Sequence, residues 1–164
     1  MSRDEIREIA EIVGGDKTYK HFVHRINKEF DISDEKRNSD VYVLFEKKDD
    51  AKIGFCVIGH SPVKMKVWEK VFKEEGWVDE DFSIGDAYEL MYMYIKPKYR
   101  ERGAGKKLFE KASLFTRDNG IKHIYSYVSD KNPNALQFYH RMNAQTIQDF
   151  SDEEVSAAFL KWDL

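Results

Sequence analysis

The segment that most constrains this chain is YIKPKYRERGAGKK, which runs from Tyr94 to Lys107. It places two glycines, Gly103 and Gly105, between a strongly apolar run and an amphipathic one. From Lys96 onwards the segment holds six Lys or Arg residues and one Glu, although the whole chain carries a net charge of -3. A glycine-bearing turn from strand to helix exposes free N–H groups at the positive end of the helix dipole. We therefore predict that this loop binds a polyanion.

Two common phosphate-binding fingerprints do not fit the loop. A Walker loop would need Gly where Arg100 stands and Ser or Thr where Lys107 stands. A dinucleotide-binding fingerprint would need a third Gly at the position of Leu108. The pattern that remains is Arg-x-x-Gly-x-Gly, formed by Arg100, Gly103 and Gly105.

Hydrophobic periodicity divides the rest of the chain into helices and strands, with no internal repeat, linker or low-complexity tract. Apolar residues three or four apart predict helices, and alternating or β-branched runs predict strands. Their order is two helices, a hairpin, then helix, strand, helix, strand, helix and two strands, which predicts one α/β domain over residues 1–164. The predicted helices cover 3–13, 20–30, 62–76, 106–117 and a short segment with Asn132 as its N-cap, and the predicted strands cover 41–46, 52–59, 87–95, 121–128, 144–150 and 157–164.

Composition argues against several classes of protein. The net charge of -3 gives no overall basic excess that would predict nucleic-acid binding. The first residues carry acids within their apolar stretch, unlike a signal peptide, and no apolar run approaches the roughly 18 residues of a membrane span. We therefore expect a cytoplasmic protein without a membrane segment. Its one cysteine, Cys56, lies in an apolar run and is expected to be a buried, inert side chain.

Two motifs together resemble the GNAT superfamily of N-acetyltransferases. The first is the loop, in which Ile95-Lys96-Pro97 leads into the Arg-x-x-Gly-x-Gly hexad, and the second is NPNALQFY, from Asn132 to Tyr139. The family's Gly-Phe step after the second motif is replaced here by Asn143-Ala144, a mild departure because Asn tolerates left-handed backbone angles. The resemblance covers roughly residues 41–164. It implies a mixed, twisted sheet of six to seven strands with helices on both faces.

The resemblance implies acetyl-coenzyme A (acetyl-CoA) as the cofactor. In this family the loop amides hold the pyrophosphate, and an open strand edge pairs with the two amides of the pantetheine arm, as an added strand would. Asn132 would contact the same arm, although a role as helix N-cap explains it equally well. The implied cofactor-binding residues are Met93, Tyr94, Ile95, Arg100, Glu101, Arg102, Gly103, Ala104, Gly105, Lys106 and Asn132.

Acyl transfer to an amine needs a base for the ammonium proton and an acid for the departing thiolate. Tyr139 resembles the family's general acid, and the alternative is an aromatic core residue beside Phe138. Glu89 is the one carboxylate within the apolar strand, where burial raises the pKa of a carboxyl toward a useful range. Its alternative is a glutamate at the exposed start of the strand, paired with a lysine. We expect no metal site, because His60, His123 and His140 lie on different segments.

The predicted reaction is direct transfer of acetyl from acetyl-CoA to a primary amine in a ternary complex. The insertion over 62–86 is rich in acids and aromatics, which would suit a cationic acceptor or simply form a solvated face and a core. A small-molecule amine and a peptide acceptor, either a protein N-terminus or a lysine, both remain open. So does a non-catalytic acyl-CoA sensor, and analogy with the family leaves a homodimer open.

Overall fold

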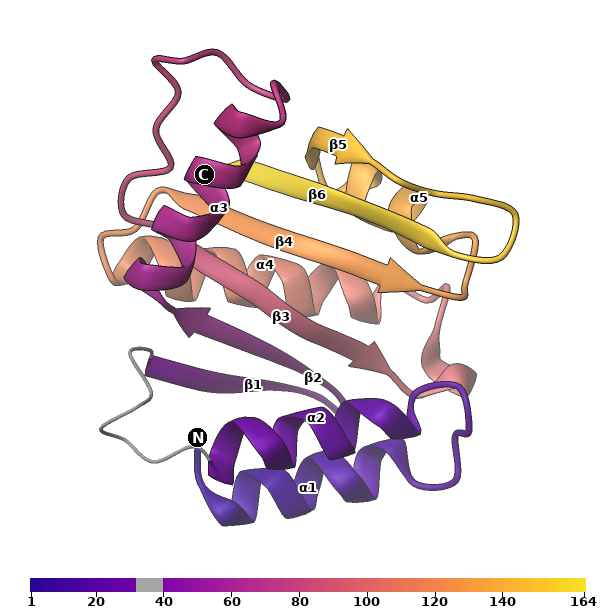
Figure 1. Ribbon diagram of the computed structural model, residues 1–164. Coiled ribbons are helices and arrows are strands. Elements are labelled where there is room, and N and C mark those ends of the chain that lie inside the picture. Colours follow the sequence, from indigo (N-terminus) through magenta and orange to yellow (C-terminus); the bar gives the residue numbers. More distant parts are fainter. Residues whose placement is uncertain (32–39) are drawn as a thin grey trace. The chain divides into compact units, whose positions relative to one another are not determined.

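The computed structural model describes residues 1–31 and 40–164, and it has the predicted order of helices and strands (Figure 1). Most boundaries fall within two residues of the predicted ones. A short 3₁₀ turn, η1 (Pro97–Tyr99), follows the third strand. The elements are α1 (Arg3–Val13), α2 (Lys20–Asp31), β1 (Asp40–Lys48), β2 (Ala51–His60), α3 (Pro62–Glu74), β3 (Tyr88–Ile95), α4 (Ala104–Asp118), β4 (His123–Asp130), α5 (Ala135–Arg141), β5 (Gln145–Asp149) and β6 (Ser156–Asp163).

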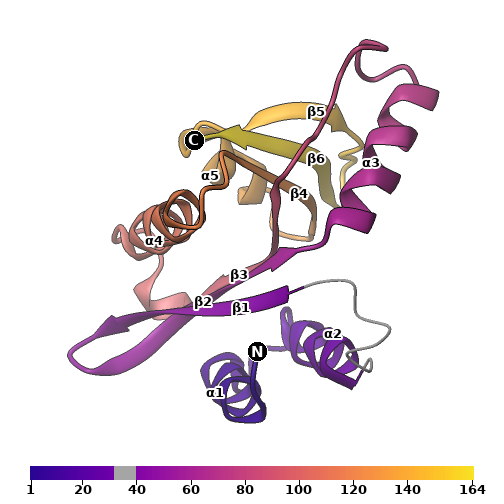
Figure 2. The same cartoon turned by 90° about the vertical axis from the view of Figure 1, so that its left-hand side faces the viewer.

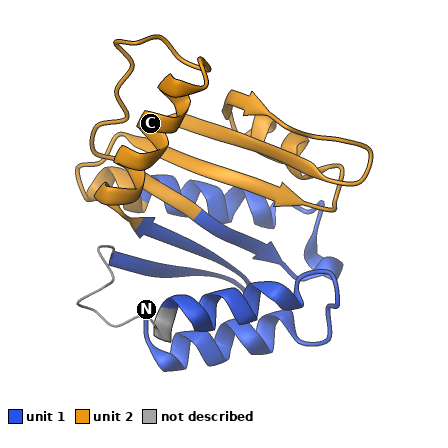
Figure 3. Ribbon diagram, in the orientation of Figure 1, with its two compact units in different colours: residues 1–59, 91–114 blue, residues 60–90, 115–164 orange. Residues whose placement is uncertain are grey.

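The strands of the described chain form a mixed sheet of six, in the order β1-β2-β3-β4-β6-β5. The strand β3 runs parallel to β4, whereas β6 is antiparallel to both β4 and β5. The predicted fold class is confirmed. Contacts divide the chain into two compact units (Figure 3). Unit 1 comprises residues 1–59 and 91–114, and unit 2 comprises residues 60–90 and 115–164. A single domain over 1–164 stays a prediction.

Unit 1 places helices on both sides of its strands. The apolar face of α1 packs with residues of α2, β1 and β2 around a core that includes Ile9, Ile26, Phe55 and Tyr94. In Figure 2, β1 and β2 run between the pair α1 and α2 and the helix α4. The hairpin turn between the strands has Asp49 and Asp50 at φ angles of 51° and 65°, as a tight two-residue turn requires.

Unit 2 is built on the long antiparallel pair of β4 and β6, whose register runs from His123 opposite Asp163 to Asp130 opposite Ser156. A hydrophobic cluster in this unit packs α3 and the rest of the insertion against these strands. It includes Met65, Phe72, Ile84 and Tyr125. In Figure 2, α3 and α5 lie on opposite sides of β6. Trp68 and Trp77 pack against this cluster. For these two aromatic residues of the insertion, the predicted role in the hydrophobic core is therefore confirmed.

Three local details differ from the predictions or refine them. Helix α4 begins at Ala104, two residues earlier than predicted, so Gly105 lies inside its first turn. Asn132 was the wrong N-cap, because α5 begins at Ala135 and its cap residue is Asn134. Asn132 instead accepts the Asn134 amide at 2.9 Å, which caps the turn that precedes the helix. Asn143 has a φ of 70°, as the departure from the family's glycine predicted.

Gly54 in β2 lies where the chain has no room for a side chain. A Cβ at this position would lie 2.6 Å from the carbonyl oxygen of Tyr94, whereas one at Gly15 would meet nothing within 4 Å. We expect Gly54→Ala to lower the free energy of unfolding by about 1–3 kcal/mol, because rigid backbone must move. The matched control Gly15→Ala should change it by less than about 1 kcal/mol. Urea unfolding of both variants measures this, and equal stabilities would contradict it.

Burial governs the chemistry of Cys56. Its side chain is 0% exposed, and this burial raises the pKa of the thiol from 9.0 to about 12. Between these two values the folded chain binds a proton that the unfolded chain has lost, so stability should fall as the pH rises above about 9. The slope contributed by Cys56 should approach about 1.4 kcal/mol per pH unit. Denaturant titrations of wild type and Cys56→Ala between pH 8 and 11 test this, and parallel pH profiles would contradict it.

Candidate active site

The predicted phosphate-binding loop is a strained turn between η1 and α4. Two of its residues have left-handed backbone angles, Glu101 at a φ of 60° and Gly103 at 85°. Gly105 lies inside the first turn of α4, so the second left-handed angle belongs to Glu101. Left-handed angles are costly for a residue other than glycine, so such strain often marks functional loops.

The start of α4 leaves amides that point out of the helix end. The main-chain ladder begins with the Lys107 amide, which donates to the Gly103 carbonyl at 3.1 Å. The amides of Ala104, Gly105 and Lys106 come before this bond, in the first turn, where helical amides have no acceptor within the helix. A Cβ placed on Gly103 would have no atom within 4 Å, so the loop is open at this point. An anion can therefore reach the amides.

The Arg100 side chain has a bracing role within unit 1. Its Nε donates to the Ile95 carbonyl at 2.8 Å, and its guanidinium lies 3.7 Å from Asp16. The guanidinium also lies over the rings of Tyr19 and Tyr94, 5.2 and 5.3 Å from their centroids. The side chain thereby ties the end of β3 to the α1–α2 connection. Sequence reasoning missed Asp16, which no local motif marks.

The end of β3 carries the residues expected to pair with the pantetheine arm. Tyr94 and Ile95 are buried, and Met93 is half-buried. The Tyr94 hydroxyl donates to Asp16 at 2.8 Å, and burial together with this bond raises the pKa of Tyr94 well above its usual value. Tyr94 is therefore a neutral, fixed side chain. Its backbone, rather than its phenol, is the part that could serve a ligand.

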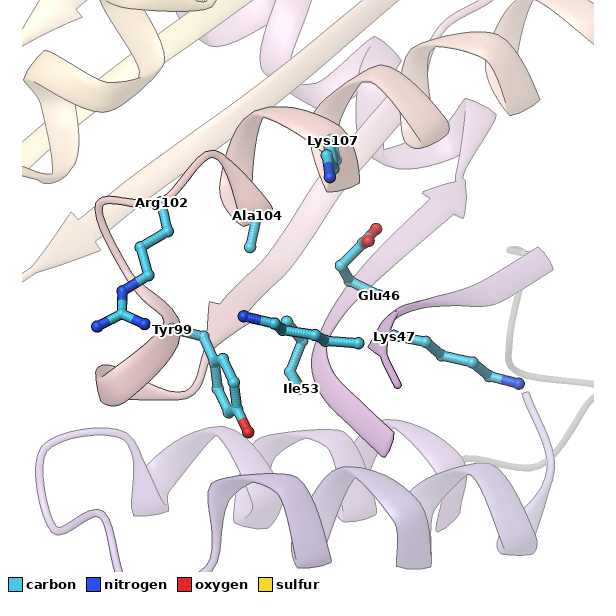
Figure 4. Close-up of a pocket in the computed structure, with 8 residues that line it drawn as sticks. Glu46, Lys47, Ile53, Tyr99, Arg102, Ala104 and Lys107 are labelled. Carbon is cyan, nitrogen blue, oxygen red and sulfur yellow. The ribbon is translucent and has the colours of Figure 1, made fainter. Parts of the chain in front are cut away.

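A pocket of about 150 Å³ lies beside the loop, within unit 1 (Figure 4). The end of β1 and the start of α4 both contribute to its wall, and the ring of Tyr99 contributes from η1. Arg102 belongs to the loop itself, and Ala104 is the first residue of α4. Sequence reasoning missed Glu46, Lys47, Lys48 and Ile53, because only tertiary contact brings them to the loop. The lining consists of Glu46, Lys47, Lys48, Ile53, Tyr99, Arg102, Ala104 and Lys107.

Tyr139 and Asn132 lie in unit 2, on α5 and the turn before it. Tyr139 is half-buried, and its ring contacts Phe138 and Trp162 at centroid distances of 5.3 and 5.7 Å. These contacts fix the ring without burying it fully, so a core contact and a functional hydroxyl are compatible. Tyr127, on β4 of the same unit, is 46% exposed.

Glu89 is a buried carboxylate held by a lysine. It is 6% exposed, and its Oε1 accepts from the Lys64 ammonium at 2.8 Å. Glu89 also pairs with Tyr125 in the parallel register of β3 and β4. Glu89 therefore combines features of both predicted alternatives. It is buried, as expected of a base, and it is paired with a lysine, as expected of a structural glutamate.

The three histidines singled out in the sequence have separate, local partners. His60 pairs with Asp86 at 2.6 Å and His123 with Asp163 at 2.8 Å, whereas His140 lies 3.2 Å from the Ala144 carbonyl. Across residues 1–31 and 40–164, no three His, Cys, Asp or Glu residues gather in a way that could hold a metal ion. In the same residues, no helix is both long and apolar enough to cross a bilayer.

Comparison with known proteins identifies the family. The sequence matches the acetyltransferase (GNAT) family over residues 6–144, and the chain belongs to this family. The predicted class of acetyl-CoA-dependent N-acetyltransferase, with acetyl-CoA as cofactor, is thereby confirmed.

Individual relatives agree with this assignment. A thialysine N-ε-acetyltransferase of Caenorhabditis elegans is 28% identical over 141 residues, which are 73% of this chain and 83% of the relative. The PaiA N-acetyltransferase of Thermoplasma acidophilum, solved in complex with coenzyme A, has the same fold with a TM-score of 0.62 and 19% identity. This likeness covers 100% of this chain and 96% of that one. A GNAT family acetyltransferase of Elizabethkingia anophelis, solved with acetyl-CoA bound, has a TM-score of 0.54 and 12% identity. This likeness covers 86% of this chain and 82% of that one.

Proposed function

We propose that this chain transfers an acetyl group from acetyl-CoA to a primary alkyl amine, by direct attack of the amine within a ternary complex. The observation that carries the proposal is the loop between η1 and α4. Its two left-handed residues and the free amides of the first helical turn would form the binding site for a pyrophosphate. Family membership supports acetyl-CoA as the compound that bears this pyrophosphate.

The residues of the loop fit the cofactor. The amides from Glu101 to Lys106 would hold the pyrophosphate, and the Arg102 and Lys106 side chains would add positive charge. Arg100 would act indirectly, because its side chain already braces the Ile95 carbonyl and Asp16. The backbone of Met93 to Ile95 would pair with the amides of the pantetheine arm. Asn132 would contact the same arm from the turn that its side chain caps.

When bound, acetyl-CoA supplies an acetyl group activated as a thioester. The acceptor ammonium would first lose one proton to the solvent path. The amine nitrogen would then form a bond to the acetyl carbon, the bond from that carbon to sulfur would break, and the second proton released by the nitrogen would replace the one that Tyr139 gives to the sulfur. We assign Tyr139 as the acid that gives its hydroxyl proton to the departing sulfur, since a phenol and an alkyl thiol have similar pKa values. A backbone amide near Tyr94 would polarise the acetyl oxygen. The contacts of Tyr139 with Trp162 and Phe138 would hold its hydroxyl in place.

Glu89 is proposed as the end of the path that removes the amine proton, through ordered water. We expect Glu89→Gln to lower kcat by roughly 10²-fold and to flatten the acidic limb of the pH–rate profile, because a neutral amide cannot accept the proton. Lys64→Met is the matched control, since it removes the lysine of the same pair and leaves the carboxylate. It should cost less activity than Glu89→Gln. If both variants lose activity equally with unchanged pH profiles, the pair is structural.

The acceptor is proposed to be a small cationic amine of the lysine type. The names of two relatives, thialysine N-ε-acetyltransferases of Caenorhabditis elegans and Bos taurus, support a terminal amine on an alkyl chain. The exposed acids Asp79, Glu80 and Asp81 on the insertion in unit 2 would attract such a cation. A peptide amine is the alternative within the same reaction.

A screen of amine acceptors tests the proposal. Thialysine, lysine, polyamines and N-terminal peptides are each incubated with the protein and acetyl-CoA, and the free thiol of coenzyme A is measured. We expect thiol release above the hydrolysis background with one of the alkyl amines, at a rate that saturates with both substrates. Binding of acetyl-CoA without turnover on any acceptor would instead favour a non-catalytic sensor.

A further inference from the structure

The pocket beside the loop concentrates positive charge. Lys48 from the end of β1, Arg102 from the loop and Lys107 from α4 line it, together with Lys47, whose side chain extends away from the other labelled side chains (Figure 4). The Lys48 ammonium lies 5.7 Å from the centroid of the Tyr99 ring, which forms part of the wall. Lys48, Arg102 and Lys107 therefore border the pocket, and Lys47 is the fourth basic residue of its lining.

The carboxylate in this lining does not neutralise these cations. Glu46 is engaged by Lys111, whose ammonium lies 3.3 Å from its Oε2 and also donates to the Phe45 carbonyl at 2.6 Å. Within residues 1–31 and 40–164, none of Lys48, Arg102 and Lys107 forms an ion pair with a carboxylate. By contrast, the neighbouring Lys106 pairs with Glu110 along α4. Like charges gathered without counter-ions repel one another, and an anionic ligand would relieve that repulsion.

We infer that the pocket binds a phosphate monoester dianion, and that this group is the 3′-phosphate on the ribose of coenzyme A. The inference rests on the proposed function, because it concerns the far end of the same ligand. Arg102 belongs both to the loop and to the pocket lining, and Ala104, another lining residue, begins the helical turn whose amides are proposed to hold the pyrophosphate. One ligand with two phosphate sites can therefore reach both. By binding this phosphate, Lys48 of the β1–β2 hairpin and Lys107 of α4 would make the affinity for coenzyme A higher than that for its 3′-dephospho form.

The test compares the binding of coenzyme A and 3′-dephospho-coenzyme A by calorimetry, which needs no acceptor. Wild type, Lys48→Gln, Lys107→Gln and the control Lys98→Gln are titrated with each ligand. Lys98 is matched to Lys48, because its ammonium also lies over the Tyr99 ring, at 4.9 Å, yet it does not line the pocket. Wild type and Lys98→Gln should bind coenzyme A at least about tenfold more tightly than the dephospho form. In Lys48→Gln and Lys107→Gln this preference should fall below about threefold.

Each other outcome overturns the inference. Equal affinity of wild type for the two ligands would show that the 3′-phosphate makes no productive contact. A preference that survives in both pocket variants would place that contact elsewhere. Inorganic phosphate that binds wild type at saturating coenzyme A, and fails to bind Lys48→Gln, would assign the pocket to a separate phosphate-bearing molecule. In all three cases the proposed function stands, whereas a complete failure of wild type to bind coenzyme A would remove the proposed function together with the inference.

Discussion

Tyr139→Phe is expected to lower kcat by roughly 10²- to 10³-fold while the Kd for coenzyme A stays within a factor of about three. A general acid contributes about this much to a rate, and the loss falls on kcat because the proton moves only in the transition state. Phe preserves the ring contacts with Phe138 and Trp162, so the fold should remain intact. Thiol release with the acceptor found in the screen gives kcat, and calorimetry gives Kd.

Tyr127→Phe is the matched control for this experiment. Tyr127 lies in the same unit and is 46% exposed, and it loses the same hydroxyl without any proposed role. Its kcat should remain within about twofold of wild type. Unchanged turnover in Tyr139→Phe would show that the side chain is only part of the aromatic packing around Trp162. Solvent or another group would then protonate the thiolate.

Gly103→Val is expected to weaken coenzyme A binding by roughly 10²-fold. Gly103 has a φ of 85°, which a β-branched residue adopts only with strain of about 1–3 kcal/mol. The variant should relieve that strain by moving the loop, which turns the amides of the first helical turn away from a common point. The expected loss equals about 2.7 kcal/mol of binding free energy, and calorimetric titration with coenzyme A measures it.

Gly85→Val separates strain from function. Gly85 has a φ of 66° in the insertion of unit 2, and a Cβ there would also meet nothing within 4 Å. It should lower the free energy of unfolding by about as much as Gly103→Val and leave the affinity for coenzyme A unchanged. If the two variants lose affinity equally, the effect of Gly103→Val reports general destabilisation, and the loop has no special role.

Local pattern was enough to predict most of the fold. Helices and strands followed from apolar spacing, and turn residues such as Asn143 and Asp49 adopted the left-handed angles that their chemistry allows. The errors lie at helix starts. Gly105 and Ala104 were expected in the loop, but α4 already includes them, since a helix can begin before its first apolar residue.

The candidate site was predictable only where its residues are consecutive in the chain. The motif from Arg100 to Lys106 and the helix that carries Tyr139 can each be found by inspection. Asp16, which holds Tyr94 and Arg100, and Lys48, which reaches the pocket from a hairpin, cannot be found in this way. Their positions depend on tertiary contacts across more than fifty residues of sequence. No helical or strand periodicity encodes such contacts.

We propose that the amides between Glu101 and Lys106 hold the pyrophosphate of acetyl-CoA. The most direct measurement is a titration of ¹⁵N-labelled protein with coenzyme A, followed through the backbone amide resonances in NMR. We expect the largest shifts at the amides of Arg102, Gly103, Ala104 and Gly105, and we expect Gly103→Val to abolish these shifts. Saturable binding that leaves the loop resonances in place and shifts amides elsewhere would contradict it.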